Sequence, residues 1–234
     1  MREHQVQCLL MGGQACVLYG AAEFSRDTDL AILASEENAG RLAKAMQALE
    51  AEVIAAPPFL LRHLEAGHAV HFRCRHPEAE GMRVDVMSRM RGVAAFAELW
   101  KRRTTLTMDD GTVCDLLSLP DLVQAKKTQR DKDWPMIRRL VEASYFAGHE
   151  APTPEQLAFW FRELRTPELL CDLARDHPAS AGQAASVRPL MLHAISGDAT
   201  ALGVALEEEE RQERRRDQDY WQPLKLELER LRRR

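Results

Sequence analysis

Two aspartates at the start of an apolar strand constrain the fold of this chain more than any other feature. Asp27 and Asp29 lead into the apolar run Leu30–Leu33, and residues two apart on a strand project from the same face. Two neighbouring carboxylates repel each other unless a cation lies between them, and Mg²⁺ prefers oxygen ligands of this kind. The pair therefore predicts a cation-binding face on a strand that is otherwise apolar.

A glycine pair upstream of these acids indicates a tight connection between a strand and a helix. Val6–Met11 has the length and apolar character of a buried strand, Gly12-Gly13 interrupts it, and Gln14–Ala22 is typical of a short helix. Glycines before a helix allow backbone N–H groups to approach phosphate oxygens closely. Taken alone, the same glycines are typical of a simple turn.

A third carboxylate is available further along the chain. Asp85 lies between Val84 and Val86 in a compact strand candidate, with Arg83 and Met87 on its own face. Asp115 lies in a later strand candidate, and spacing alone does not choose between the two acids. The sequence thus predicts three acids that face one site, the third being Asp85 or Asp115.

The remaining segments separate into a mixed part and a helical part. The mixed part is expected to contain a capped helix, a hairpin of two strands, a short helix, a turn and a last strand: Ser35–Glu52, His68–His76 with Met82–Met90, 94–103, Asp109–Gly111 and 112–119. After Pro120 the sequence predicts helices alone, with breaks near Pro152, Pro178 and Gly197, and a charged helical tail interrupted near Pro223. We therefore expect an α/β fold with a small mixed sheet in residues 1–119, followed by a helical region in residues 120–234.

Composition restricts the class of protein. The net charge of −4 gives no overall positive field for nucleic acid, although basic residues cluster locally. The five cysteines are scattered without a Cys-x-x-Cys pair, which favours a reducing compartment. The apolar stretch at the N-terminus is short for a signal peptide, and no segment approaches the roughly 18 apolar residues of a membrane span. We expect a cytoplasmic protein that does not enter a membrane.

The order of these motifs resembles the nucleotidyltransferase superfamily, whose fold is that of polymerase beta. The closer resemblance is to the branch of abortive-infection-type toxin nucleotidyltransferases, over about residues 6–140. There, a glycine pair and a helix precede an arginine, a threonine and two acids; here Ser25 stands at the threonine position and Glu23 where an arginine is common, with Arg26 directly before Asp27. That branch also carries a basic segment after its last strand, similar to "LPDLVQAKKTQRDKDWPMI".

The resemblance implies a reaction and a set of site residues. It implies transfer of a nucleoside monophosphate from an NTP such as ATP, with two Mg²⁺ or Mn²⁺ ions about 3.5–4 Å apart. Asp27, Asp29 and Asp85 would hold the metals, and Asp85 would help to deprotonate the acceptor. The nucleotide would be held by Gly12, Gly13, Ser25, Arg26, Lys126 or Lys127, Arg130, Lys132 and Asp133.

Other interpretations of the same residues remain open. The acceptor implied by the resemblance is tRNA or a protein hydroxyl, in a setting that includes a cognate antitoxin; a small molecule such as an antibiotic is the alternative. Glu23 keeps open an inactive module that only binds a nucleotide. The charged run "KKTQRDKD" is also typical of a solvated helix face. The group His63, His68, His71, Cys74 and His76 has no standard zinc spacing, so we predict no zinc site there, and nothing in the sequence connects His71 or His76 with the acids.

Overall fold

The computed structural model describes residues 1–233, which divide into two compact units. The first unit contains Met1–Ala125 together with the chain from Asp219 onward, and the second contains Lys126–Gln218. The sequence-based boundary at Leu119 lies close to the first division point, but the return of the C-terminal segment to the first unit was not expected. Each unit is described by itself below.

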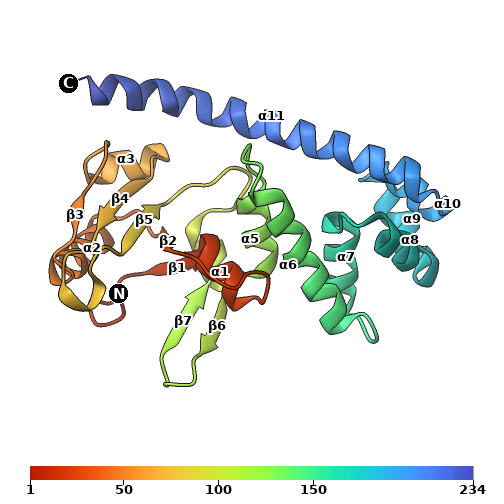
Figure 1. Cartoon of the computed structure of the whole chain (residues 1–234), viewed down its shortest axis with the longest axis horizontal. Coiled ribbons are helices and arrows are strands. Elements are labelled where there is room, and N and C mark those ends of the chain that lie inside the picture. The colour runs from red at the N-terminus through yellow and green to blue at the C-terminus, as the bar shows by residue number, and fades with distance from the viewer. Residues whose placement is uncertain (234) are drawn as a thin grey trace. The chain divides into compact units, whose positions relative to one another are not determined.

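Within the described residues, the first unit is built on a seven-stranded mixed sheet (Figure 1). Its strand order is β3-β4-β5-β2-β1-β7-β6. The strands are β1 (Cys8–Met11), β2 (Asp27–Ile32), β3 (Glu52–Val53), β4 (Val70–Arg73), β5 (Arg83–Met87), β6 (Thr104–Thr107) and β7 (Val113–Leu116). β2 is antiparallel to β1 and parallel to β5, so the strand with the two aspartates lies inside the sheet.

Apolar residues of alternate strand positions form the core of this unit. Val84 and Val86 of β5 are buried with Val70 of β4, and Ile32 of β2, on the same face, is completely buried. Arg83, Asp85 and Met87, which alternate with these two valines, therefore face the opposite surface of the sheet. This alternation places Asp85 on the polar face, as its apolar neighbours predict.

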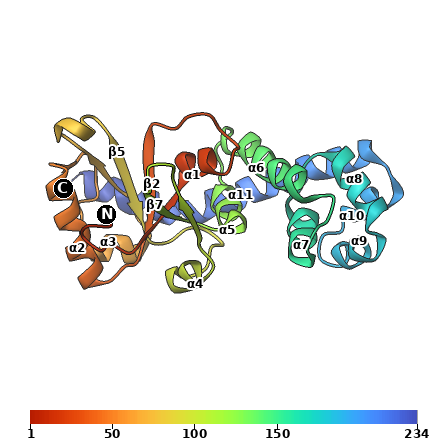
Figure 2. The same ribbon diagram turned by 90° about the horizontal axis from the view of Figure 1, so that it is seen from below.

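In the described part of this unit, five helices and one 3₁₀ turn accompany the sheet, in addition to the C-terminal helical segment from Asp219 onward. They are α1 (Gly12–Leu18), α2 (Glu36–Ala48), α3 (Leu61–Ala66), η1 (Pro77–Ala79), α4 (Phe96–Lys101) and α5 (Leu119–Lys126). α2 and α3 lie beside β3 and β4 in Figure 1, and Figure 2 shows the same two helices from below. Ser35 caps α2 by accepting a hydrogen bond from the Asn38 N–H. The buried Asn38 side chain accepts from the Gln7 N–H and donates to the Gln7 and Leu33 carbonyls. One asparagine thereby joins α2 to the ends of β1 and β2.

The expected elements of the mixed part are present, with differences at their ends. The hairpin of β4 and β5, the strand β7 and the capped helix α2 are confirmed, but α2 ends at Ala48 rather than near Glu52. The predicted helix Gln14–Ala22 is shifted, because α1 starts at Gly12 and includes both glycines. β3, β6 and α3 were not predicted. Their short segments, "EV", "TTLT" and "LRHLEA", are too brief for periodicity to identify.

The second unit is helical, as the sequence predicts. It contains α6 (Asp133–Gly148), α7 (Pro154–Glu163), α8 (Pro167–Asp176), α9 (Pro178–Ala185), α10 (Met191–Ser196) and the first part of α11 (Ala199–Arg232). The breaks predicted near Pro152, Pro178 and Gly197 are confirmed. Thr153 forms a capping box with Gln156 at the start of α7, and Gly197 ends α10 in the left-handed conformation.

The predicted interruption at Pro223 is wrong. α11 continues from Ala199 to Arg232 with Pro223 inside it (Figure 1), although proline removes one backbone donor from a helix. The turns after Pro223 belong to the first unit and contact it through Leu224 and Glu227. These contacts stabilise the helix beyond the proline. No helix in the described part of the chain is both long and apolar enough to cross a membrane.

Candidate functional site

A polar row crosses three neighbouring strands of the sheet. The register pairs Asp29 of β2 with Asp85 of β5, and Asp85 with His71 of β4. On the other side, Asp29 is paired with Met11, the residue before the glycine pair. Because directly paired residues share a face, Asp29, Asp85 and His71 lie side by side on the same surface. Asp27 lies on that face two residues before Asp29 and is paired with Arg83.

The glycine pair makes room for side chains of β2 and of the loop before it. Gly12 has φ +67°, and a Cβ placed on it would lie 1.8 Å from Oδ2 of Asp29. A Cβ on Gly13 would lie 2.3 Å from the Ser25 Oγ. The space beside the two glycines is therefore occupied by the Asp29 carboxylate and the Ser25 hydroxyl. This brings the Asp29 charge to the first turn of α1, where the positive end of the helix dipole stabilises an anion.

Asp85 is held by two cationic or polar partners on the same face. Arg83 donates from Nε to Oδ1 at 3.0 Å and from a terminal nitrogen to Oδ2 at 3.1 Å. Nδ1 of His71 lies 2.8 Å from Oδ1. Burial raises the pKa of the Asp85 carboxyl, but the hydrogen bonds and charges of His71 and Arg83 outweigh it and lower the pKa overall. Asp85 is thus an anion near neutral pH.

The three acids share a face without forming a closed ligand cluster. Among residues 1–233, the single set of three His, Cys, Asp or Glu side chains with ligand atoms all within 4.8 Å of one another is His63, His68 and Glu227, in another part of the sheet unit. By donor chemistry, the carboxylates of Asp27 and Asp29 fit Mg²⁺. Asp85 fits as a third ligand if Arg83, whose side chain is 38% exposed, moves aside.

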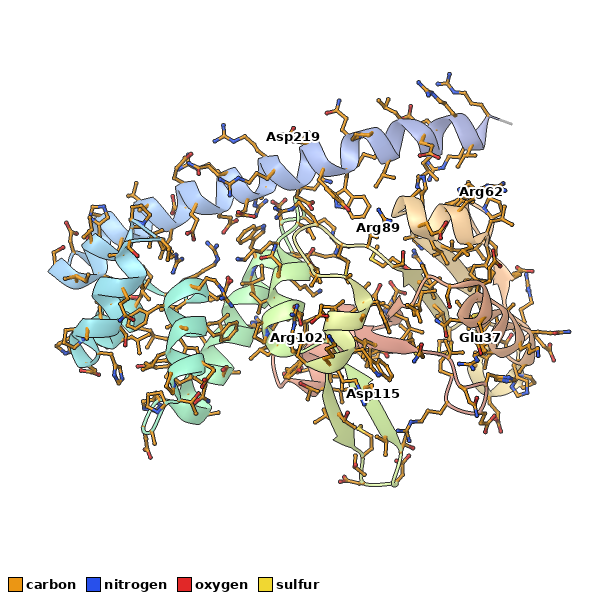
Figure 3. The ribbon with its side chains drawn as sticks, turned by 180° about the vertical axis from the view of Figure 1, so that it is seen from behind. Glu37, Arg62, Arg89, Arg102, Asp115 and Asp219 are labelled. Carbon is orange, nitrogen blue, oxygen red and sulfur yellow. The ribbon has the colours of Figure 1, made fainter. Side chains whose placement is uncertain are left out.

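The alternative third acid, Asp115, has a different environment. It lies on β7, which is separated from β2 by β1, and its position is labelled in Figure 3. Oδ1 of Asp115 accepts hydrogen bonds from Nε of Arg103 at 3.0 Å and from Oγ1 of Thr105 at 2.6 Å. The direct register between Asp29 and Asp85 therefore favours Asp85 over Asp115 as the third acid of the site.

The two remaining residues expected near the acids differ in their contacts. Ser25 donates from Oγ to the backbone carbonyl of Asp27 at 3.3 Å, which orients the loop before β2. Arg26, beside it, is exposed. Ser25 therefore makes a contact that positions this loop, and Arg26 lies exposed directly before Asp27.

The basic segment predicted to bind the nucleotide belongs to the second unit, and most of it surrounds one buried acid. Asp133 is 2% exposed; Oδ2 accepts from Thr128 at 2.6 Å and from Arg130 at 2.7 Å, and Lys126 lies 3.4 Å from Oδ1. Burial raises the Asp133 pKa, but Thr128, Lys126 and Arg130 outweigh it and lower the pKa. Lys132 is exposed at the start of α6. This segment forms a network of ion pairs in a loop rather than a solvated helix face.

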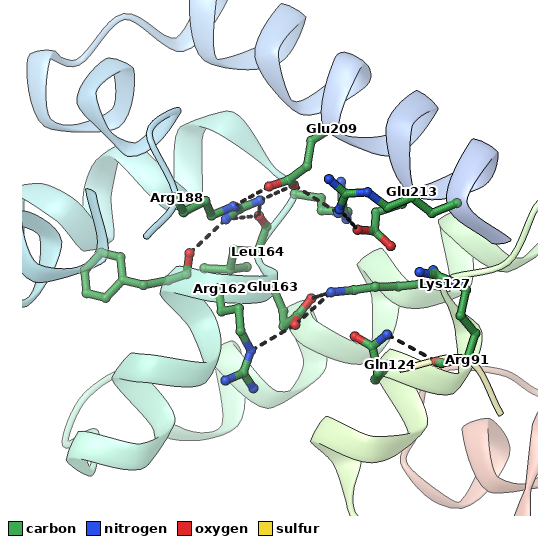
Figure 4. A network of polar contacts seen from close by, with 12 residues as sticks. Arg91, Gln124, Lys127, Arg162, Glu163, Leu164, Arg188, Glu209 and Glu213 are labelled. Atoms are coloured by element: carbon green, nitrogen blue, oxygen red, sulfur yellow. Dashed lines mark hydrogen bonds and ion pairs between the residues drawn. The ribbon is translucent and has the colours of Figure 1, made fainter. Parts of the chain in front are cut away.

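Lys127 belongs to a second network in the same unit (Figure 4). Its Nζ donates to Oε1 of Glu163 at 3.0 Å and lies 2.7 Å from Oε2. Arg162 also pairs with Glu163, and Arg188 forms a two-pronged pair with Glu209. Lys127 lines a cavity of about 980 Å³ in the helical unit. Its charge is therefore already balanced by a carboxylate that is 3% exposed.

Sequence reasoning missed the partners of Asp85. Arg83 was placed on the face of Asp85 by its spacing two residues before it, but its ion pair with Asp85 was not predicted. His71 could not be assigned, because the register of the hairpin between β4 and β5 depends on a turn that the sequence leaves undetermined. Both side chains belong to the candidate site by geometry.

Comparison with known proteins adds no family to this picture. The chain matches no protein-family model and no curated protein.

Proposed function

We propose that the first unit is a metal-dependent nucleotidyltransferase that uses an NTP. The observation that carries this proposal is the register that pairs Asp29 with Asp85, next to a glycine pair that holds the Asp29 carboxylate at the start of a helix. The resemblance to the nucleotidyltransferase superfamily implies this arrangement. In it, a strand, a glycine pair and a helix are followed by a returning strand with two acids, and a parallel strand beside it carries a third acid.

Each acid has a role that its environment supports. Asp27 and Asp29 offer carboxylate oxygens on one face, which suits Mg²⁺ or Mn²⁺. The bound metal would supply charge stabilisation for the transferred phosphoryl group and for the leaving pyrophosphate. The lowered pKa of Asp85 keeps it charged, so it suits the holding of a cation better than the uptake of a proton, since a carboxylate of low pKa is a weak base. Arg83 and His71 are positioning residues that orient Asp85.

The candidate acceptors follow from the resemblance. The resemblance favours tRNA or a protein hydroxyl, in a toxin-like setting with a cognate antitoxin, and a small molecule is the alternative within the same chemistry. An inactive module that binds a nucleotide is the candidate from another class. In such a module nothing would require three acids on one face, so their register favours the enzyme.

Label transfer tests the reaction and the acceptor together. The full chain is incubated with Mg²⁺ and each α-³²P-labelled NTP in turn, with total tRNA, cell-extract protein or a pool of small molecules as acceptor. Asp29→Asn is the test variant. Asp115→Asn is the matched control, because it removes one carboxylate charge from the same sheet away from the polar row.

The outcomes separate the candidates. We expect label to move to one acceptor class with the wild type and with Asp115→Asn, and not with Asp29→Asn. Transfer that Asp29→Asn leaves intact would refute the assignment of this site. Nucleotide binding that requires Mg²⁺, without transfer to any acceptor, would favour the inactive module, and no binding by isothermal titration would reject both.

A further inference from the structure

Two buried histidines and one carboxylate meet at the end of α3, outside the polar row. His63 lies in α3, His68 follows the glycine that ends this helix, and Glu227 comes from the part of α11 that belongs to the same unit. One potential ligand atom of each side chain lies within 4.8 Å of the other two. This group is independent of the proposed transfer reaction and of its acids.

Both imidazole rings carry a buried nitrogen without a hydrogen bond. His63 is 5% exposed and His68 is 4% exposed, and Nε2 of each has no hydrogen-bond partner. Nε2 of His68 lies 3.2 Å from Oε2 of Glu227, yet this contact does not have hydrogen-bond geometry. A buried polar atom without a partner destabilises a fold by about 1–3 kcal/mol, so two such atoms on neighbouring rings require an explanation.

The local backbone brings these groups together. Gly67 ends α3 with φ +100°, and the reversal of the chain there sets the His63 and His68 rings edge to face with centroids 5.9 Å apart. α11 packs on the same turn: a Cβ on Gly67 would lie 3.5 Å from Cδ1 of Leu224, one helical turn before Glu227. The carboxylate is thus carried to the histidines by a helix that contacts their turn at a second point.

We propose that His63, His68 and Glu227 bind a zinc-class divalent ion, which fastens the C-terminal part of α11 to α3. Neutral imidazole and carboxylate are ligands of zinc, which lies about 2.0–2.2 Å from each. Ligands of a tetrahedral ion at that distance are about 3.3 Å from each other, close to the 3.2 Å between His68 and Glu227. Two histidines and one glutamate leave a fourth position for water. Mg²⁺, which prefers oxygen ligands, is not expected here.

The protonation of His63 is compatible with this role. Burial lowers its pKa, as do the neighbouring Arg62 and His68, while Glu227 acts in the opposite direction. The result is a neutral imidazole near neutral pH, which is the form that binds a metal. Arg62 is labelled on α3 in Figure 3.

Metal binding to the full chain tests the proposal. Protein freed of metal by chelation is titrated with ZnCl₂ at pH 7.5 by calorimetry, and with CoCl₂ while the visible ligand-field spectrum of a tetrahedral site is recorded. His68→Gln and Glu227→Gln remove ligands. Glu229→Gln is the matched control, because it removes the same charge from an exposed position of the same helix. Glu227 is 48% exposed, so its variant is expected to fold even if His68→Gln does not.

The expected result is one zinc ion per chain, a higher melting temperature with zinc, and a tetrahedral cobalt spectrum. Each ligand variant should weaken zinc binding by more than about tenfold and lose the cobalt spectrum, whereas Glu229→Gln should match the wild type. Asp29→Asn should also bind zinc normally, which separates this site from the polar row. An absence of zinc binding, or zinc binding that Glu227→Gln leaves unchanged, would overturn the proposal.

Discussion

Replacing Gly12 with alanine tests the close approach on which the candidate site depends. The structure gives two reasons for a loss of stability: Gly12 has φ +67°, and the new Cβ would lie 1.8 Å from Oδ2 and 2.4 Å from Cγ of Asp29. Gly20 provides a matched control. It also has a positive φ, +76°, but a Cβ there meets nothing within 4 Å. Gly20→Ala therefore measures backbone strain alone, and Gly12→Ala measures strain plus displacement of the Asp29 carboxylate.

The magnitudes follow from these two terms. A left-handed backbone conformation destabilises an alanine by about 1–2 kcal/mol, and the stiffer unfolded chain returns about 0.4–1 kcal/mol. We expect Gly20→Ala to lower the free energy of unfolding by about 0.5–1.5 kcal/mol. At Gly12, the crowding of Asp29 adds about 1–3 kcal/mol, for a total of about 2–4 kcal/mol.

Urea denaturation followed by circular dichroism measures both changes, and calorimetry measures Mg²⁺-dependent NTP binding by each variant. Gly20→Ala should keep nucleotide binding, and Gly12→Ala should lose it because Asp29 has moved. If Gly12→Ala were no less stable than Gly20→Ala, the carboxylate would not be packed against Gly12. Binding of NTP and Mg²⁺ by Gly12→Ala at the wild-type level would lead to the same conclusion. Either result would refute the close approach of Asp29 to Gly12 on which the proposed function depends.

Three further predictions concern the polar networks. Glu163→Gln removes the buried carboxylate that pairs with both Lys127 and Arg162, so it should lower the free energy of unfolding by about 3–5 kcal/mol. Arg162→Ala, at a side chain 58% exposed, should lower it by less than about 1 kcal/mol, and urea denaturation compares the two variants. The lowered pKa of Asp133 stabilises the fold above the ordinary carboxyl pKa of about 4, and this stability is lost as the pH falls through the lowered value. The difference in free energy of unfolding between wild type and Asp133→Asn should therefore shrink from pH 7 to pH 3, and an unchanged difference would contradict the pairing. Asn38→Ala removes three hydrogen bonds to Gln7 and Leu33. It should lower the free energy of unfolding by about 2–3 kcal/mol, and with it the melting temperature. A decrease in melting temperature no larger than that of a substitution at an exposed position of α2 would show that these hydrogen bonds do not stabilise the fold.

Local patterns in the sequence were sufficient for the elements with strong periodicity or caps. Ser35 and the acids after it predict the start of α2, and the valines around Asp85 predict both its strand and its face. Short elements such as β6 carry too little pattern to be found. The break predicted at Pro223 was wrong because helix propensity depends on local sequence. The turns after Pro223 are held by contacts of Leu224 and Glu227 with residues far away in the sequence.

In the candidate site, too, some features follow from the local sequence and others depend on contacts between distant segments. The sequence by itself determined that Asp27 and Asp29 share a face, because a strand has a period of two, and that a glycine pair lies before them. Only the tertiary structure decided that Asp85 lies directly beside Asp29, that His71 and Arg83 hold it, and that Gly12 receives the Asp29 carboxylate. The group of His63, His68 and Glu227 was likewise hidden, because Glu227 lies far along the chain from the two histidines. Periodicity fixes which residues point the same way along one element, whereas strand order, register and helix docking depend on how buried surfaces of distant segments fit together.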